Sequence, residues 1–257
     1  MTSTNPRAAG GWGGRLILSP GRLLSIGPGG AAEQHAHHAT QLVVGLRAEV
    51  KLEVDGRRLR RRATMVRSNV PHAFEAGDNG IALILLDANQ TAARQMPDSY
   101  HATELRPIID GLGAPSVEWS STQLAEWLTE MLARLGAEPR PRVLSGATRR
   151  ALDYVEGELE RVPRLDVAAE RAALSPSRLS HLFRLEVGLP FRRFVLWARL
   201  KRAAELAAGG ATITECAVAA GFSDGAHFSR TFRGHFGLPP SVVLPLIELD
   251  PLGWPTS

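Results

Sequence analysis

The chain has little that would tie it to an oxidising compartment or to a membrane. Its 257 residues include one cysteine, Cys216, so no internal disulfide can stabilise the fold as it does in many small secreted domains. No apolar run reaches the length of about 20 residues that a membrane-spanning helix needs, and no basic-then-apolar leader opens the sequence. We therefore expect a cytoplasmic protein with no membrane partner.

Charge and composition allow several kinds of partner and more than one domain. Lys and Arg outnumber Asp and Glu by 30 to 26, for a formal net charge of +4, which permits a polyanionic partner without demonstrating one. With 44% hydrophobic residues, a chain of this length can build a core in each of two domains. We expect an α+β protein whose first part is β-rich and whose last part is helical.

Residues 1–96 read as an all-β domain. Apolar and charged side chains alternate over residues 50–54, and Asp55-Gly56 follows as a tight turn, a pattern typical of a half-buried hairpin. The apolar run 81–86 has the length of a buried strand. The five arginines between positions 57 and 62 fit a solvated hairpin edge better than a nucleic-acid patch, because charges on an edge strand prevent further pairing.

Residues 97–142 form a linker region that contains one amphipathic helix. Ser120 and Gln123 make a capping-box pattern, and apolar residues recur at helical spacing from Leu124 to Leu135, which predicts a helix with one apolar face. This face can pack on its own β-domain or pair with the same helix of a second subunit in a homodimer, and the sequence leaves both open. Pro139-Arg140-Pro141 then indicates a stiff linker at the domain boundary.

Residues 143–246 are predicted to be helical, with a repeat that carries the main functional signal. The copies run over 167–188 and 215–237, offset by 48 residues before an internal turn and by 49 after it. Each copy predicts a helix, a tight turn and a second helix, which is a helix-turn-helix unit. Between them, residues 190–208 predict one continuous helix, long enough to hold the two units about one duplex turn apart. Residues 247–257 remain as a C-terminal tail.

The second helix of each unit is the candidate DNA-reading element. With the apolar anchors turned inward, its outward positions are small residues, which let a helix approach a groove, and Arg and His, which donate hydrogen bonds to guanine and phosphate. For a single such helix a solvated basic face would be the better explanation than DNA contact, but two copies favour DNA contact. The candidate DNA-binding residues are Ser177, Arg178, Ser180, His181, Arg184, Gly225, Ala226, His227, Arg230 and Arg233.

These motifs resemble the signature of the AraC family of transcription regulators. The resemblance covers 174–183 (LSPSRLSHLF), 221–232 (GFSDGAHFSRTF) and 237–240 (GLPP). It implies sequence-specific binding of double-stranded promoter DNA, modulated by an effector in the N-terminal domain, with RNA polymerase as a further candidate partner. By position, the family's base-reading sites fall on Ser177, Ser180, His181, Gly225, Ala226, His227 and Arg230. One departure is Val242-Val243-Leu244-Pro245, where relatives carry an aromatic residue and an arginine, so a phosphate contact of the last helix is in doubt.

The N-terminal region resembles the cupin-like β-barrel that many family members carry as a sensor. The similar residues are His35, His37, Gln41 and His72. Strand alternation puts His35, His37 and Gln41 on one side and turns His38 away, while a returning strand brings His72 opposite. The resemblance implies a divalent transition metal, with Gln41 as a weaker, neutral ligand where cupins have Glu. A pocket for a small polar molecule, or histidines that only hydrogen-bond within the barrel, remain alternatives.

We expect a regulator and no enzyme, since the sequence shows no acid–base pair or nucleophile arrangement. A cupin enzyme fused to a DNA-binding module is one alternative, which metal analysis with a turnover screen would separate. A non-specific nucleoid protein is another, and competition with unrelated DNA would reveal it. Cys216 is expected to be a small core residue rather than a redox sensor.

Overall fold

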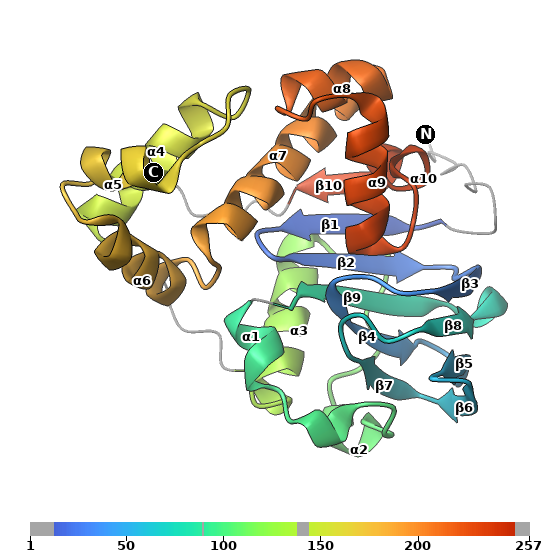
Figure 1. The fold of residues 1–257 in the computed structure, drawn as a ribbon. Coiled ribbons are helices and arrows are strands. Elements are labelled where there is room, and N and C mark those ends of the chain that lie inside the picture. Colours follow the sequence, from blue (N-terminus) through green and yellow to red (C-terminus); the bar gives the residue numbers. More distant parts are fainter. Residues whose placement is uncertain (1–12, 89, 138–143, 250–257) are drawn as a thin grey trace.

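The computed structural model describes residues 13–88, 90–137 and 144–249, and it consists of a two-sheet β-domain with a helical domain docked on it (Figure 1). One sheet has the strand order β10-β1-β2-β9-β4-β7. These strands span Ile247–Leu249, Arg15–Ser19, Arg22–Gly27, Ile81–Asp87, Ala39–Gly45 and Ala63–Val66. The other has the order β3-β8-β5-β6, formed by Ala31–His35, His72–Glu75, Val50–Val54 and Arg57–Arg61. The predicted β-rich domain followed by a helical domain is thus confirmed.

The β5–β6 hairpin forms as its sequence predicts. Val54 pairs with Arg57 across the two-residue turn Asp55-Gly56, whose φ angles of 51° and 71° are both positive, as a tight hairpin turn requires. β6 is the edge strand of its sheet, and Arg57, Arg58 and Arg60 are exposed there. The arginine run therefore lies on a solvated hairpin edge.

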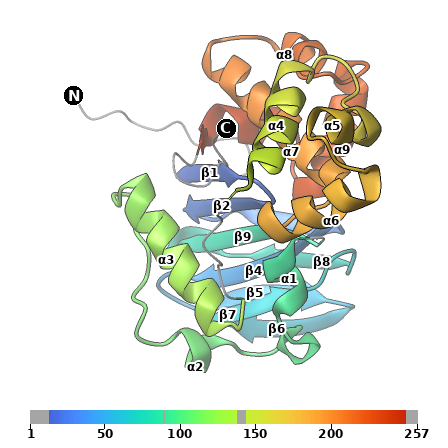
Figure 2. The ribbon, with the colours of Figure 1, turned by 90° about the vertical axis from the view of Figure 1, so that its left-hand side faces the viewer.

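The amphipathic helix packs on its own β-domain. α3 (Ser121–Arg134) begins with the predicted capping box between Ser120 and Gln123 and lies across the six-stranded sheet (Figure 2). Its apolar face shares one buried cluster with the sheet: Leu124, Trp127, Leu128, Met131 and Leu132 pack with Ile17, Leu24, Leu42, Met65 and Ile84. Of the two partners left open for this face, the structure shows the β-domain. The proposed Pro139-Arg140-Pro141 linker lies outside the described residues.

The helical domain contains both predicted helix-turn-helix units. The first is α5 (Leu165–Arg171) and α6 (Pro176–Glu186), preceded by α4 (Gly146–Gly157); the second is α8 (Ile213–Ala219) and α9 (Gly225–Phe236), followed by α10 (Pro240–Val243). α7 (Phe191–Ala208) runs between them as the predicted single helix (Figure 1). Cys216 is fully buried, and burial raises the pKa of its thiol, so it is a core residue as expected.

The repeat reflects shared backbone geometry. Ala173 in the first turn and Gly221 in the second have φ angles of 55° and 80°. Gly188 after α6 and Gly237 after α9 have φ angles of 79° and 71°. These left-handed conformations end one helix and redirect the chain, and glycine adopts them without steric cost. Small residues therefore recur at corresponding positions of both units.

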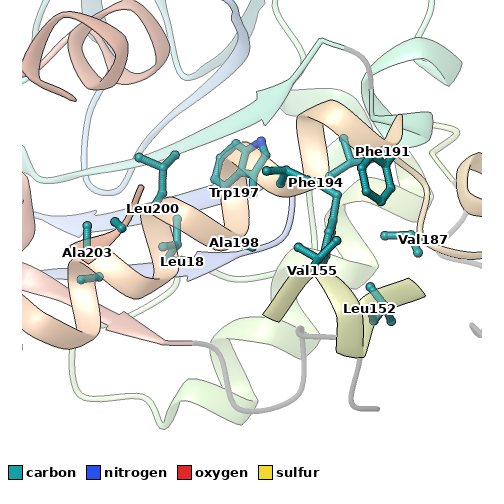
Figure 3. Packing of buried hydrophobic residues seen from close by; sticks show 14 of the residues in the cluster. Leu18, Leu152, Val155, Val187, Phe191, Phe194, Trp197, Ala198, Leu200 and Ala203 are labelled. Carbon is teal, nitrogen blue, oxygen red and sulfur yellow. The ribbon is translucent and has the colours of Figure 1, made fainter. Parts of the chain in front are cut away.

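The two domains share a hydrophobic core. Leu18 of β1 lies beside Leu200 and Ala203 of α7 (Figure 3). β10, which comprises the first three residues of the predicted tail, pairs in parallel with β1. Arg15 Nε donates to Glu248 Oε1 at 2.8 Å across this pair of strands. The helical domain is thus attached to the sheet through side chains and through backbone hydrogen bonds.

Short elements complete the chain. They are α1 (Thr91–Gln95), α2 (Arg106–Ile109) and the 3₁₀ turns Gly77–Asn79, Asp98–Tyr100 and Leu244–Leu246. Within the ranges that the structure describes, no helix combines the length and the hydropathy that crossing a bilayer would require.

Candidate DNA interface and effector site

The first candidate reading helix, α6, presents its predicted polar face to solvent. Ser175 caps the helix by accepting a hydrogen bond from the backbone N–H of Arg178 at 3.3 Å, and Pro176 occupies the first turn, where a missing N–H costs nothing. Leu179 and Phe183 are fully buried beneath it. The predicted contact residues Ser177, Arg178, His181 and Arg184 are exposed, and Ser180 is half-buried.

The second candidate reading helix, α9, repeats this arrangement. Asp224 caps it by accepting from the His227 backbone N–H at 2.6 Å, and Ser223 Oγ lies 3.0 Å from His227 Nδ1, which orients that imidazole. Phe228 and Phe232 are fully buried. The predicted contact residues Ala226, His227, Arg230 and Arg233 are exposed, and Gly225 is half-buried.

Both helices thus offer what a major-groove reader needs. Each has a rigid apolar side held in a common core and an exposed side of small residues, arginine and histidine. Arginine can donate two hydrogen bonds to guanine or bind phosphate, and small side chains allow close approach of the helix. All ten residues predicted from the sequence are accessible in whole or in part.

The second predicted site, the histidine cluster, comprises His35, His37 and His72 with Gln41 beside them. The imidazole centroids of His35 and His72 are 4.4 Å apart, and those of His37 and His72 are 5.0 Å apart. One ligand nitrogen from each of the three histidines lies within 4.8 Å of the others. β3 and β8 pair directly at His35 and His72, so the returning strand brings these two together as the sequence predicts. The prediction that one strand carries His35, His37 and Gln41 is wrong, because β3 ends at His35 and Gln41 lies on β4 of the other sheet.

The hydrogen bonds of the three imidazoles fix which nitrogen faces the cluster. Each Nδ1 lies against a backbone carbonyl: His35 at 2.7 Å from Glu33 O, His37 at 3.0 Å from Ala39 O, and His72 at 2.8 Å from Val70 O. Only an Nδ1–H can make these bonds, so in the neutral rings each Nε2 keeps its lone pair. Metal-binding histidines in proteins are oriented by this kind of bond to the other ring nitrogen.

Two polar atoms of the cluster lack partners among the described residues. They are His72 Nε2 and Gln41 Nε2, both buried. Gln41 Oε1 lies 3.1 Å from His37 Nε2, which places two acceptors side by side. Either the amide turns so that its N–H donates to His37, or a cation lies between the two. Ligands at about 2.1 Å from one ion are roughly 3.0–3.4 Å apart at ordinary angles, so this separation suits a shared metal.

Burial keeps two of these imidazoles neutral. Burial, with a smaller contribution from the neighbouring His35, lowers the pKa of both His37 and His72 to about 4. The hydrogen bonds to Ala39 O and Val70 O act in the opposite direction but are outweighed. Since only the neutral ring coordinates metal, the residues fit a divalent transition metal held by three imidazole nitrogens and an amide oxygen.

The end of the second reading helix covers this cluster. The His38 backbone N–H donates to Gly234 O of α9 at 3.0 Å, and the His38 ring lies 5.7 Å from His235, turned away from the other histidines as predicted. A Cβ on Gly237, the C-cap of α9, would lie 2.6 Å from the His35 ring. The candidate effector site and a candidate DNA-reading helix are therefore in direct contact.

A buried ionic cluster between the domains was not predicted. Asp87, at the end of β9, is 0% exposed and accepts from Arg193 Nε and Trp197 Nε1 of α7, both at 2.9 Å. Burial by itself would raise the pKa of Asp87, but hydrogen bonds from His235, Arg193 and Trp197 and the Arg193 charge hold it well below its usual range. The only hint in the sequence is a carboxylate that ends a wholly apolar strand, which shows that Asp87 needs a partner but does not identify it.

Comparisons with known proteins find matches to the helical domain. Residues 168–244 match the protein family described as a helix-turn-helix domain. The Msm operon regulatory protein of Streptococcus mutans serotype c is 34% identical over 79 residues, which are 30% of this chain and 28% of that protein. The matched residues thus span less than a third of the length of that relative.

Solved structures of other proteins are also similar to this chain. A transcriptional regulator from Chromobacterium violaceum, described among AraC-type DNA-binding domain-containing proteins, is 31% identical. The match covers 37% of this chain and 86% of that one, with a TM-score of 0.35. ToxT from Vibrio cholerae is 11% identical over 88% of this chain and 98% of its own, with a TM-score of 0.46.

Proposed function

We propose, from the premise that residues 168–244 form an AraC-type helix-turn-helix domain, that this chain is a sequence-specific DNA-binding transcription regulator. Its binding to promoter DNA is modulated by an effector in the cupin-like β-domain. The observation that carries the proposal is the pair of capped, exposed helices α6 and α9, built on the same plan at the two ends of α7.

The make-up of these helices favours sequence reading over general attraction to DNA. A nucleoid protein needs only positive charge along the duplex, because phosphate contacts carry no sequence information. Here the exposed faces combine arginines with Ser177, Gly225 and Ala226, small residues that bring the helix backbone close to base edges. Two readers separated by a rigid helix would contact two successive major grooves from one subunit.

Selection from a pool of random double-stranded DNA tests the proposal. The full chain should enrich a common motif, and a labelled fragment carrying it should stay bound when unrelated DNA is added in excess at physiological salt. Specific sites are typically bound about 10³–10⁷ times more tightly than non-specific DNA. Enrichment of no motif, with equal competition by any DNA, would leave the nucleoid-protein alternative.

We also propose that the histidine cluster binds a divalent transition metal through His35, His37 and His72, with Gln41 as a fourth ligand. Three histidine ligand atoms within 4.8 Å of one another, three Nδ1–H groups bonded to backbone carbonyls and a buried His72 Nε2 without a partner among the described residues support it. Ligands of one tetrahedral ion lie about 3.4 Å apart, so nitrogens that lie within 4.8 Å of one another would have to close by up to about 1.4 Å to share it. A small polar molecule in the same place remains the competing effector.

The rest of the proposal follows from the role of a promoter-binding regulator. It places the chain in the cytoplasm with the chromosome, as a homodimer, with RNA polymerase as a further candidate partner, and it gives the chain no enzymatic activity. Because the apolar face of α3 is already covered by the β-domain, a dimer would use another surface. A turnover screen of the metal-loaded protein would test the non-enzymatic part.

A further inference from the structure

One large apolar side chain lies on the exposed face of a reading helix. Leu185, near the end of α6, is 61% exposed. Among the described residues of α6 and α9, it is the only large hydrophobic residue that is exposed. A single exposed leucine needs no explanation on an ordinary protein surface. On a face that becomes buried against DNA, however, it gains free energy only if its partner is apolar as well.

Leu185 belongs to the same stripe of α6 as two of the predicted contact residues. Arg178, His181 and Leu185 follow one another at intervals of three and four residues, so their side chains are neighbours on one face of the helix. The stripe spans about 10 Å at 1.5 Å per residue, and the major groove is about 12 Å wide. A groove that receives Arg178 and His181 therefore has room for Leu185.

The backbone around Leu185 is fixed by hydrogen bonds. Glu186 Oε2 accepts from the Ser145 backbone N–H at 2.9 Å and from the Ser145 hydroxyl at 3.0 Å. Gly188 O accepts from the Thr91 backbone N–H of the β-domain at 3.2 Å. Such anchoring matters for an apolar contact, because dispersion attraction needs atoms about 3.5–4.0 Å apart and weakens when a gap opens.

The edges of the bases offer Leu185 a single kind of apolar partner. In the major groove this is the C5-methyl group of thymine, whereas the other groups displayed there are hydrogen-bond donors and acceptors. A leucine pressed against a donor such as the amino group of cytosine would leave that group without a partner, which is unfavourable.

From this geometry we infer that Leu185 packs against a thymine methyl group in the half of the binding site that α6 reads, and selects thymine over cytosine there. The inference rests on the proposed function and adds a specificity-determining residue to it.

The second unit has no counterpart of this contact. With the offset of 49 residues between the units, Leu185 corresponds to Gly234 of α9, which carries no side chain. The Gly234 carbonyl accepts from the His38 backbone N–H at 3.0 Å. The methyl contact therefore belongs to one half of the binding site only.

Removing single methyl groups from the DNA tests the inference. The α6 half of the selected fragment is the stretch whose protection from cleavage weakens in Arg178→Ala. Each thymine in it is replaced in turn by deoxyuridine, which lacks only the C5-methyl group. One replacement should weaken binding by the full chain about fourfold, as expected for the loss of one buried carbon.

Variants of Leu185 show whether this side chain senses the methyl group. Leu185→Ala should bind the thymine and deoxyuridine fragments equally, and the thymine fragment at least about fourfold more weakly than the parent. Leu185→Met keeps a long apolar side chain and should still prefer thymine. Val162→Ala shortens an exposed apolar side chain outside both reading helices and should prefer thymine as the parent does.

Two results overturn the inference while leaving the proposed function in place. One is a selected motif whose affinity does not change at any deoxyuridine in the α6 half. The other is an equal deoxyuridine penalty in the parent and in Leu185→Ala, which would assign the methyl contact to a different side chain. A parent chain that selects no motif at all overturns the proposed function, and this inference with it.

Discussion

At the scale of single residues, Arg230 is the clearest candidate for a base or phosphate contact. It is exposed on α9, six residues after the N-cap Asp224, with Phe228 and Phe232 holding the helix beneath it. Arg230→Ala should weaken binding to the selected DNA fragment by about 1–3 kcal/mol and leave the fold intact. Fluorescence anisotropy of labelled DNA measures the change.

The matched control for Arg230 is Arg202→Ala on α7, which removes an exposed guanidinium outside both reading helices. It should bind the fragment like the parent. If Arg230→Ala also bound every sequence as tightly as the parent, the second unit would not be a reader.

The histidine cluster predicts a contrast among neighbouring residues. His35→Ala, His37→Ala and His72→Ala each remove one converging nitrogen and should lose bound metal, since three imidazoles and a neutral amide leave no spare ligand. His38→Ala should keep it, because His38 faces His235 and not the cluster. Elemental analysis after supply of zinc, nickel, iron, manganese and copper measures occupancy. A parent protein that stays metal-free would favour the polar-pocket alternative.

The same histidines make the metal-free fold sensitive to acid. The pKa of His37 and of His72 is about 4 in the fold and about 6.5 in an unfolded chain. The unfolded chain therefore binds more protons between these values, and the free energy of unfolding should fall as pH drops through this range. From pH 7 to pH 5 the loss should be roughly 2 kcal/mol for each histidine.

Urea unfolding with a chelator present measures this slope. His72→Asn should reduce it by about half, whereas His38→Ala should keep it. An unfolding free energy that does not change between pH 7 and pH 5 would show that the two imidazoles are solvated rather than buried.

At the scale of elements, the stability of the second reader depends on its aromatic anchors. Phe232 is fully buried, with its ring 5.7 Å from Phe228 and 4.5 Å from Phe236. Phe232→Ala should destabilise the protein by about 3–5 kcal/mol, since it removes a packed ring and leaves a cavity. Val218→Ala on the exposed side of α8 should stay within about 0.5 kcal/mol of the parent. An unchanged urea midpoint for Phe232→Ala would contradict this packing.

Elements with local signals were predictable from the sequence. The Ser120 capping box gave the start of α3, Ser175-Pro176 gave the start of α6, and Asp55-Gly56 gave the β5–β6 turn, because each depends on neighbours in the chain. The covering of the apolar face of α3 was not predictable, since a stripe shows that a helix is amphipathic but not what it packs on.

The candidate sites were also predictable only where they depend on local patterns in the sequence. The exposed faces of α6 and α9 follow from helical periodicity, and the His35–His72 pairing follows from the returning strand. Alternation along one strand does not explain Gln41, which lies on β4 of the other sheet. The contact of Gly237 with His35 depends on how the domains dock, for which no local pattern exists.

At the scale of the whole molecule, the arrangement of the two domains connects sensing with reading. Asp87 holds Arg193 and Trp197 of α7, β10 pairs with β1, and Leu238 enters the β-domain core. These contacts join segments far apart in the chain, which is why the sequence alone indicated two domains but not their interface. The β-domain contacts both units, because the Thr91 N–H donates to Gly188 O just after α6 at 3.2 Å and the His38 N–H donates to Gly234 O of α9 at 3.0 Å.

Hydroxyl-radical footprinting on the selected DNA fragment tests the central claim, that one chain reads two successive major grooves through α6 and α9. The account predicts two protected stretches about one helical turn, roughly 10–10.5 base pairs, apart on one side of the duplex. Arg230→Ala should weaken one stretch and the double variant Arg178→Ala/His181→Ala the other. A single stretch, or uniform protection that neither variant changes, would contradict it.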